Sequence, residues 1–527
     1  MFIQSLISKL QSDAALAGQV RTAVILLAVL PLGIHVLIKG RELLIELIRY
    51  FEFFCQHTEF YKKSEKKPYR TIFMRLPFPW PTENTYYLLD HEPMRKLFAR
   101  SPNLDAFALA RRLHYVVWQV PPLAYKDTLR EAAKKIHVEL SAKKLGPVTR
   151  TFEDVLRADI ASLKKKVGNE GRLVPFHTTF YRMAYAGNMK AIYGPNLPVT
   201  ETRIALQNFA INLYALNATP SLPVLPTEWW NRIFPASRKG AQARDDVTNA
   251  LIKWQQEGGL ETCSDTWRNI MQVVLDKNVP IVHSNRWVNM VLFGFQGNTG
   301  EQPGWAFLHI LQSPKLWAAI QAEVDALPPD LLTGTDFRRV TPLLYSSIHE
   351  TLRLSTAVFA GRQATIDTKI QGCDTLFPKG SLIRTMSRAS AFDDRIWGAD
   401  ADCFKGDRFL LNENLYKEEL FFGGGVSACP GRHFALAELE LLMAHIIREF
   451  EFDHKTLEMH KKLPPEAKDL ELAPKVDSKF SCDIIDLDGT KIKGVHPGVA
   501  DVDYRMESVS GSLYPLQEST CFIKPRY

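Results

Sequence analysis

Cys429 is the residue best suited to a chemical role, because it lies between a glycine-rich segment and a predicted helix. Gly423, Gly424 and Gly425 precede it, and glycine lets a backbone bend and come close to a large flat group. The helix-favouring run after Pro430 predicts a helix that begins beside the cysteine. The free N–H groups at such a helix start favour a thiolate. A thiolate held against a flat, open space is suited to ligating haem iron.

Taken alone, this segment leaves two other interpretations open. A lone cysteine is most often a small buried hydrophobe. A glycine-rich turn before a helix can also hold a phosphate.

The composition indicates one large globular domain behind an N-terminal anchor. The chain has 527 residues, of which 46% are hydrophobic and 23% are charged, so it is long enough to bury a core. No glycine-serine linker, repeat or low-complexity segment divides it. The net charge of +7 is modest and no nucleic-acid motif is present, so we expect no nucleic-acid partner.

The cysteines argue against a zinc site and a disulfide framework. They include no Cys-x-x-Cys pair, so a structural zinc site is not expected. An odd, sparse set also indicates a reducing compartment for most of the chain. The seven are Cys55, Cys263, Cys373, Cys403, Cys429, Cys482 and Cys521.

An uncharged apolar run over residues 22–38 is long enough to span a bilayer, which takes ~17–25 residues. A cleaved signal peptide is the alternative, but Lys39-Gly40-Arg41 follows the run in place of a small-residue cleavage site. More basic residues follow the run than precede it, which places the larger part in the cytosol. We predict a lumenal N-terminus over residues 1–21, a transmembrane helix over 22–38 and an amphipathic, basic juxtamembrane segment over 39–69.

The remaining pattern predicts a mainly α fold with a minor β region. Apolar spacing predicts helices over Thr151–Lys166 and Arg432–Phe450. Arg353–Ser381 contains short β-like pieces around a turn. Residues 219–235, rich in proline and bulky apolar side chains, form either a buried loop or a surface that dips into a membrane.

The cysteine segment resembles the haem-binding signature of the cytochrome P450 superfamily, Phe-x-x-Gly-x-Arg-x-Cys-x-Gly. Phe422, Gly425, Cys429 and Gly431 match it in type and spacing, while Ser427 stands where the signature has arginine. The resemblance implies that Cys429 ligates the iron of haem b and that the other three matching residues belong to the cofactor site. It also implies a mainly α fold of the cytochrome P450 type.

The Glu-x-x-Arg sequence at Glu350 and Arg353 resembles the second signature of that family. Residues at i and i+3 of a helix face the same way and can pair. Arg408 lies in a segment similar to the family's Phe-x-Pro-Glu-Arg-Phe and would complete a network with them. The resemblance implies a structural role for the three side chains, which lock the framework around the thiolate loop.

A long helix over Trp287–Phe307, with glycines and a proline inside it, is expected to cross the haem face. The family usually has Ala-Gly-x-(Asp/Glu)-Thr here, where acid and alcohol deliver protons to bound dioxygen. This chain has Gln296, then Gly297 at the acid position and Asn298 at the threonine position. The resemblance therefore places proton delivery on Asn298, Thr299 or bound water. An amide positions water but supplies no proton at neutral pH.

These departures resemble the branch that contains the sterol 7α- and 12α-hydroxylases and prostacyclin synthase, and they suit a fungal biosynthetic member. Without an arginine at Ser427, the haem carboxylates need another cation. Arg362 is the first candidate, and Lys134 and Arg130 are weaker ones.

The resemblance covers about residues 69–506, so it implies a haem-thiolate catalytic domain over 70–506 and a C-terminal tail over 507–527. The implied enzyme is a single-pass monooxygenase of the endoplasmic reticulum membrane that faces the cytosol. Its partners would be dioxygen, NADPH–cytochrome P450 reductase and, as a further candidate, cytochrome b5. The implied substrate is large and apolar, steroid or terpenoid-like, within a biosynthetic pathway.

Two other functions stay open. The first is a reductase-independent haem-thiolate isomerase or dehydratase that acts on a peroxide. The second is a membrane haem-binding or scaffold protein without turnover.

Overall fold

The computed structural model describes residues 71–74, 84–121, 126–217, 235–330, 332–357, 360–460, 483–492 and 518–526. The predicted lumenal N-terminus, transmembrane helix and juxtamembrane segment, and most of the proline-rich segment over 219–235, lie outside these residues. Among the helices of the described ranges, none combines the length and apolar character needed to cross a bilayer.

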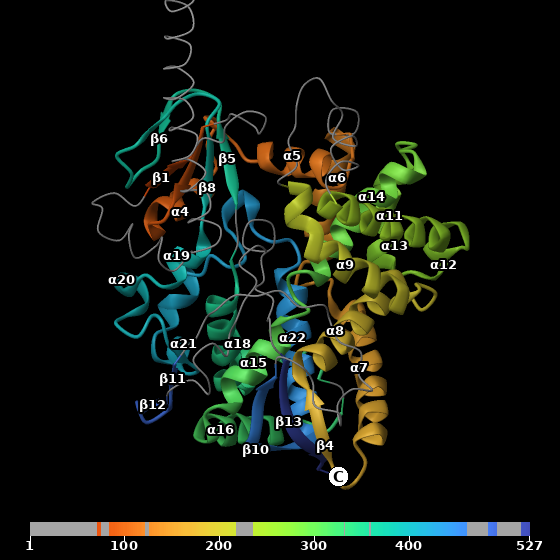
Figure 1. Ribbon diagram of the computed structural model, residues 1–527, viewed down its shortest axis with the longest axis vertical. Coiled ribbons are helices and arrows are strands. Elements are labelled where there is room, and N and C mark those ends of the chain that lie inside the picture. The colour runs from red at the N-terminus through yellow and green to blue at the C-terminus, as the bar shows by residue number, and fades with distance from the viewer. Residues whose placement is uncertain are drawn as a thin grey trace, which may run out of the picture.

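The described chain is mainly helical with small sheets, as the sequence predicts (Figure 1). Its helices are α4 His91–Phe98, α5 Ala108–Val116, α6 Lys126–Glu139, α7 Gly146–Val167, α8 Phe176–Tyr193, α9 Val199–Asn217, α11 Pro235–Gln256, α12 Gly259–Thr262, α13 Asp265–Leu275, α14 Ile281–Gln296, α15 Gln302–Leu311, α16 Pro314–Asp325, α17 Phe337–Val340, α18 Pro342–Ser355, α19 Ser387–Ala391, α20 Asp394–Trp397, α21 Arg408–Leu411 and α22 Arg432–Glu449. Two short 3-10 turns cover Glu413–Lys417 and Gly425–Ser427.

Among the described residues the strands form one sheet of five strands, two sheets of three strands and one two-stranded pair. They are β1 Thr71–Met74, β2 Thr85–Leu88, β3 Leu104–Asp105, β4 Arg172–Pro175, β5 Gly361–Ala364, β6 Thr368–Lys369, β7 Leu376–Phe377, β8 Leu382–Thr385, β9 Phe404–Lys405, β10 Phe450–His460, β11 Ile484–Ile485, β12 Lys491–Ile492 and β13 Glu518–Pro525. The larger sheet has the order β1-β2-β8-β5-β3, and it lies at the upper left of Figure 1 with α4.

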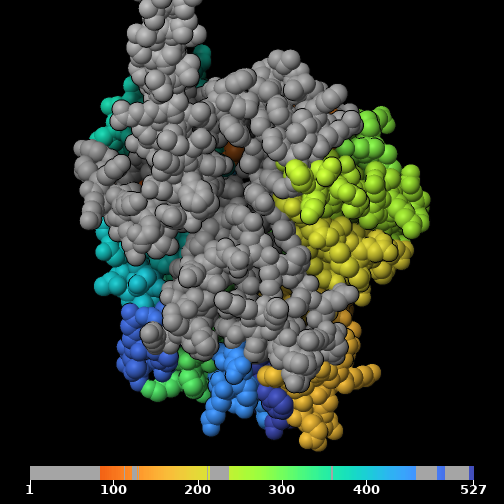
Figure 2. Space-filling view, viewed as in Figure 1, coloured from red at the N-terminus to blue at the C-terminus, as the bar shows by residue number. Residues whose placement is uncertain are grey.

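The second sheet has the order β10-β13-β4 and includes part of the predicted C-terminal tail. β13 is its middle strand and pairs antiparallel with both neighbours. Cys521 and Ile523 on β13 are buried, so this part of residues 507–527 belongs to the core and not to a trailing tail. Figure 2 shows these blue segments at the lower end of the molecule and the yellow-green helices α9 to α14 at its right side.

α22 lies at the centre of the helical body, because it is apolar on nearly every side. It packs against α7, α15, α16 and α18, and its second half is almost wholly buried. Both predicted helices are confirmed, since α7 contains Thr151–Lys166 and α22 spans all but the last residue of Arg432–Phe450. The predicted β-like pieces correspond to β5, β6 and β7, although Arg353–Ser355 still belong to α18.

The helix across the cavity is interrupted, which differs from the single helix predicted over Trp287–Phe307. α14 ends at Gln296 and α15 begins at Gln302, and turns fill residues 297–301. Two of those five residues are glycines, which weaken a helix by ~1 kcal/mol each relative to alanine. Pro303 falls in the first turn of α15, where the missing N–H costs nothing.

Candidate functional site

Cys429 lies in the loop that leads into α22, and hydrogen bonds on both sides of this residue fix its backbone. Its own N–H donates to the Phe422 carbonyl at 2.8 Å, and Arg432 Nη1 donates to the Cys429 carbonyl at 3.1 Å. Burial raises the pKa of the Cys429 thiol, while the N–H groups of Gly431 and Arg432 and the Arg432 charge act against that rise. A thiolate here therefore needs one more positive partner, and a bound metal ion is such a partner.

The loop before Cys429 is fixed against α4 by glycine. Gly425 has φ +53°, and a Cβ there would lie 2.2 Å from the Phe98 carbonyl oxygen. Gly423 also has a positive φ, of +67°, a region that glycine alone enters freely. Gly425, predicted as a cofactor-binding residue, thus shapes the loop by letting it approach Phe98.

Two cavities, of about 240 and about 430 Å³, meet at Cys429. Five residues line both, and they come from α14 with its C-terminal turn and from the cysteine loop: Gly294, Phe295, Asn298, Cys429 and Gly431. The α14 wall therefore faces the cysteine across an open space. Volumes of this size are typical of small-molecule and cofactor sites.

The residues around this space fit haem. Phe422 and Phe434 give the smaller cavity aromatic walls on the cysteine side. A Cβ at Gly431 would lie 4.0 Å from both Cys429 Sγ and the Phe295 ring. Glycine at this position therefore leaves the space between the sulfur and the ring free of a side chain. Ser427, the residue in place of the family's arginine, lies on the wall of the same cavity.

Arg362 on β5 has the properties expected of a partner for a haem carboxylate. Its side chain is buried, its guanidinium carbon lies 5.7 Å from the centre of the Phe98 ring, and Nη1 donates to the Gly361 carbonyl at 3.1 Å. Its Nη2 has no hydrogen-bond partner among the described residues. Burial lowers the pKa of Arg362. Arg362 is not among the residues that line the two cavities, but Phe98, the ring beneath it, also borders Gly424 and Gly425 of the cysteine loop. A buried, incompletely paired guanidinium is suited to an anionic group.

The other predicted cations differ in position. Lys134 is exposed on α6 and is not among the residues that line the cavities, whereas Arg130, one turn earlier, lines the larger one. Arg130 also lies over the Phe107 ring, at 5.0 Å. Sequence reasoning missed Arg384 on β8, which lines the smaller cavity, because a single arginine in a short strand carries no signal.

The four residues predicted to face the haem, residues 296–299, divide into two that line a cavity and two that do not. Asn298 lines both cavities, and Thr299 lines the smaller one while its Oγ1 donates to the Phe295 carbonyl at 2.8 Å. Gly297 and Gln296 are buried away from the lining. A Cβ at Gly297 would lie 2.9 Å from the Phe293 ring, so Phe293 occupies the space that an acid at this position would need.

The predicted Glu350–Arg353–Arg408 network is present and buried. Arg353 Nε and Nη2 donate to Glu350 at 2.8 Å each, and Arg408 Nε donates to Glu350 Oε1 at 2.8 Å. Lys405 adds a backbone N–H to the same oxygen at 3.0 Å. Burial alone would raise the pKa of Glu350, but the two guanidinium groups hold it below its usual value.

The two arginines also tie distant backbone together. Arg353 donates to the carbonyls of Ala391, Ala401 and Cys403, the last two at 2.7 and 3.1 Å. Arg408 donates to the Trp397 carbonyl at 2.6 Å. The network therefore fixes the chain between α19 and α21 against α18.

Glu438 on α22 is a buried carboxyl that sequence reasoning missed. It lines the smaller cavity and accepts a hydrogen bond from Asn188 Nδ2 at 2.9 Å. Burial raises the pKa of Glu438 well above its usual value, which favours the neutral, protonated carboxyl in the folded protein. Nothing in the helical pattern of α22 separates this glutamate from an ordinary surface residue.

Comparison with known proteins gives one family. The family model described as Cytochrome P450 matches residues 104–476. The human 7-alpha-hydroxycholest-4-en-3-one 12-alpha-hydroxylase is 29% identical over 216 residues, which cover 37% of this chain and 43% of that protein. Cytochrome P450 monooxygenase nodJ of Hypoxylon pulicicidum is 26% identical over 311 residues, 55% of this chain and 58% of that protein. The chain thus matches about half the length of these curated relatives.

Replacement of Glu350 by alanine leaves the buried Arg353 without an anion and leaves Arg408 paired with Asp400 alone. Removing one partner of a buried ion pair typically costs ~3–5 kcal/mol. We therefore expect Glu350→Ala to lose most bound haem and to unfold at lower temperature, measured by the haem-to-protein ratio and thermal unfolding. Glu413→Ala, which removes an exposed pair with Arg338, is the control. Normal haem content in Glu350→Ala would contradict the structural role.

The raised pKa of Glu438 gives a prediction for stability against pH. In the unfolded chain the carboxyl releases its proton above about pH 4.5, whereas the folded protein keeps it. The folded state then binds more protons, so stability falls as pH rises above that value. Glu438→Gln keeps an acceptor for Asn188 and removes this effect. The melting temperature of the variant should rise relative to the wild type from pH 5 to pH 8, and a difference that does not change with pH would refute the assignment.

Proposed function

This chain belongs to the cytochrome P450 family, and from that premise we propose that it is a haem-thiolate monooxygenase acting on a large apolar substrate. The observation that carries the proposal is the position of Cys429. This cysteine and Asn298 both line the two cavities. The curated relatives named monooxygenases and hydroxylases support the reaction class.

Haem b would be held by Cys429 as the axial ligand and by cations at its carboxylates. Arg362, Arg130 and Arg384 are the candidates on this chain for those carboxylates. When bound, the haem supplies the reductive activation of dioxygen, with a thiolate ligand that favours O–O cleavage.

The protein residues orient the reactants and exclude water. Asn298 presents an amide to the open space and can hold water there. Trp287, Met290 and Val291 make one wall of the larger cavity apolar. An apolar wall of this kind favours a large hydrocarbon skeleton, because its burial removes apolar surface from water.

We assign the substrate to the steroid or terpenoid-like class within a biosynthetic pathway. Two observations support this assignment: the apolar wall of the larger cavity and a human relative whose name describes 12-alpha-hydroxylation of 7-alpha-hydroxycholest-4-en-3-one. The fungal relative is also named as a monooxygenase. The electrons would come from NADPH–cytochrome P450 reductase, with cytochrome b5 as a further candidate donor.

One observation favours a second candidate function, a reductase-independent isomerase or dehydratase that rearranges a peroxide. Gly297 leaves the facing segment without an acid at the position where the family usually has one, and the neighbouring Asn298 carries no dissociable proton. A cavity without an acid beside Asn298 is consistent with a reaction that needs no external protons or electrons, such as the rearrangement of a peroxide.

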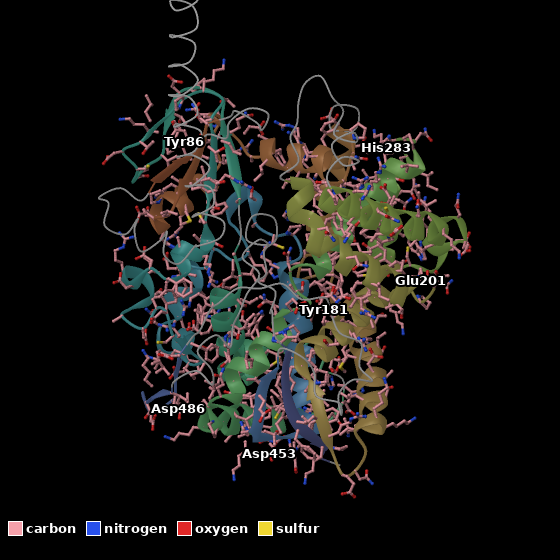
Figure 3. The ribbon with its side chains drawn as sticks, viewed as in Figure 1. Tyr86, Tyr181, Glu201, His283, Asp453 and Asp486 are labelled. Carbon is pink, nitrogen blue, oxygen red and sulfur yellow. The ribbon has the colours of Figure 1, made fainter. Side chains whose placement is uncertain are left out.

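We also propose that the protein is a single-pass protein of the endoplasmic reticulum membrane with its catalytic domain in the cytosol. The hairpin around β6 and β7 supports a membrane contact, because Ile366 and Leu376 are 50% and 52% exposed. The Phe377 ring packs edge-on against Tyr86 of β2, labelled in Figure 3, at 5.1 Å. β2 pairs with β1, the first described strand of the chain.

The two candidate reactions differ in what they consume. With the reductase, NADPH and an apolar steroid or terpenoid, we expect a product that carries one added oxygen atom from labelled dioxygen. Mass spectrometry of the product measures this. Turnover of a hydroperoxide or endoperoxide without NADPH or reductase, and no oxygen incorporation with them, would establish the second candidate instead.

Membrane contact through the hairpin can be tested in a chain that lacks residues 1–38. We expect Ile366→Asp with Leu376→Asp to weaken its sedimentation with phosphatidylcholine vesicles by roughly tenfold or more, because each large apolar side chain contributes up to ~1.5–3 kcal/mol on burial. Leu411→Asp, at a position that is 67% exposed on α21, is the matched control. Equal vesicle binding by both proteins would argue against the contact.

A further inference from the structure

The proposed monooxygenase reaction, on which this inference rests, consumes protons that the wall formed by Asn298 and its neighbours does not supply. One R–H and one dioxygen, with two electrons from NADPH through the reductase and two protons, give R–OH and water. Thr299 directs its hydroxyl hydrogen at the Phe295 carbonyl. Glu438 is the one carboxyl among the described residues that line the two cavities. It belongs to α22, which follows the cysteine loop, and accepts a hydrogen bond from Asn188; the segment with Asn298 contributes no carboxyl to the lining.

Glu301 is the first carboxyl after Asn298, and it lies inside the interruption between α14 and α15. Its side chain is buried, with the residue 5% exposed. Oε2 lies 3.7 Å from Nδ1 of His177 on α8, which is 4% exposed. The neighbours Thr299 and Gln302 both line the smaller cavity. Glu301 therefore belongs to the same short turn as two residues of the cavity wall.

Two glycines let α8 come this close to α15 and the turn before it. A Cβ at Gly304 would lie 2.3 Å from His177 Nδ1, and one at Gly300 would lie 2.5 Å from the ring of Tyr181. Tyr181, labelled in Figure 3, follows His177 by one turn of α8. Because neither glycine has a side chain, the His177 imidazole can pack against α15 next to Glu301.

A buried carboxyl beside a buried imidazole can hold one exchangeable proton without a net charge. The shared proton makes the pair either neutral or an ion pair, so neither state leaves an isolated charge in the interior. Imidazole also exchanges protons near neutral pH. The Glu301–His177 pair thus has the chemistry of a proton store, which Gly297 and Asn298 lack.

Gln296 provides a place for water at the start of the same interruption. It is fully buried, and neither Nε2 nor Oε1 has a hydrogen-bond partner among the described residues. A buried amide of this kind is usually satisfied by ordered water. The backbone of Gln296 adjoins Gly300, whose N–H donates to the Gln296 carbonyl at 3.1 Å, and Gly300 packs against Tyr181 of α8. Water bound there would lie on the same side as the Glu301–His177 pair.

We propose that Glu301 and His177 supply protons to the Asn298 side of the cavity through water held in the α14–α15 interruption. A proton leaves the pair for the water, the water would carry it to the Asn298 side of the cavity where the two protons of the reaction are consumed, and solvent protonates the pair again. Glu301 and His177 act through water and are positioning residues for proton delivery. The pair would take the place of an acid that Phe293 excludes from position 297.

The test compares Glu301→Gln with Glu301→Asp and with the control Glu323→Gln, which changes a carboxylate that caps α18. All are assayed as full-length holoenzyme with reductase and NADPH. Glu301→Gln should lower the fraction of electrons recovered in product at least roughly tenfold, since general acid catalysis contributes ~100-fold or more. Hydrogen peroxide release and the solvent deuterium isotope effect on product formation should rise. Glu301→Asp should restore much of the coupling, and Glu323→Gln should match the wild type.

Coupling and isotope effect unchanged in Glu301→Gln, with normal haem content, would overturn the inference. If that variant does not fold, His177→Gln gives the same comparison from the other side of the pair. A crystal structure of the wild type supplies a readout without turnover. Ordered water that bonds both the Gln296 amide and Glu301 supports the route, and a dry space there overturns it. If the wild type itself forms no product, the proposed function is refuted. The crystallographic search for water between Gln296 and Glu301 then still tests the proposed water route separately.

Discussion

The structure depends on one buried carboxylate, Glu350, which is held by two buried guanidinium groups. Charges inside a protein are tolerated only when they are paired and hydrogen-bonded, and here Arg353 and Arg408 donate to the same acid. Their remaining donors reach carbonyls between residues 391 and 403. This fixes a long irregular segment against α18. Phe421, at the start of the cysteine loop, then packs on His349 of the same helix at 6.0 Å.

The second constraint is set by glycines near the two cavities at Cys429, where the backbone comes close to neighbouring groups. Gly425 lets the cysteine loop touch α4, Gly431 keeps side chains away from the sulfur, and Gly297 makes room for Phe293. The last of these has a chemical consequence, because the position that carries an acid in the family is filled by a phenylalanine ring. If the reaction is monooxygenation, its protons must then come from elsewhere. The next acid along the chain is the buried Glu301, which lies 3.7 Å from His177 and stands between the wall residues Thr299 and Gln302 in the sequence.

The sequence predicts those features whose signal is local. Cys429, the Glu-x-x-Arg spacing and the helices within α7 and α22 follow from motifs and periodicity, and the structure brings Glu350, Arg353 and Arg408 together. Features that depend on distant contacts are not predictable in this way. β13 belongs to a sheet because it meets β4, more than 300 residues earlier in the chain. Arg384 and Glu438 become cavity residues only through the packing of α14, α22 and the strands.

The central claim is that Cys429 presents a thiolate to haem iron in the space below α14. The most direct measurement is the absorption spectrum of the reduced, carbon-monoxide-bound protein. The account predicts the Soret band typical of thiolate-ligated haem in the wild type and in Asn298→Ala, and its loss in Cys429→Ala. A wild-type protein that binds haem without this band, or a Cys429→Ala variant that keeps it, would contradict the account.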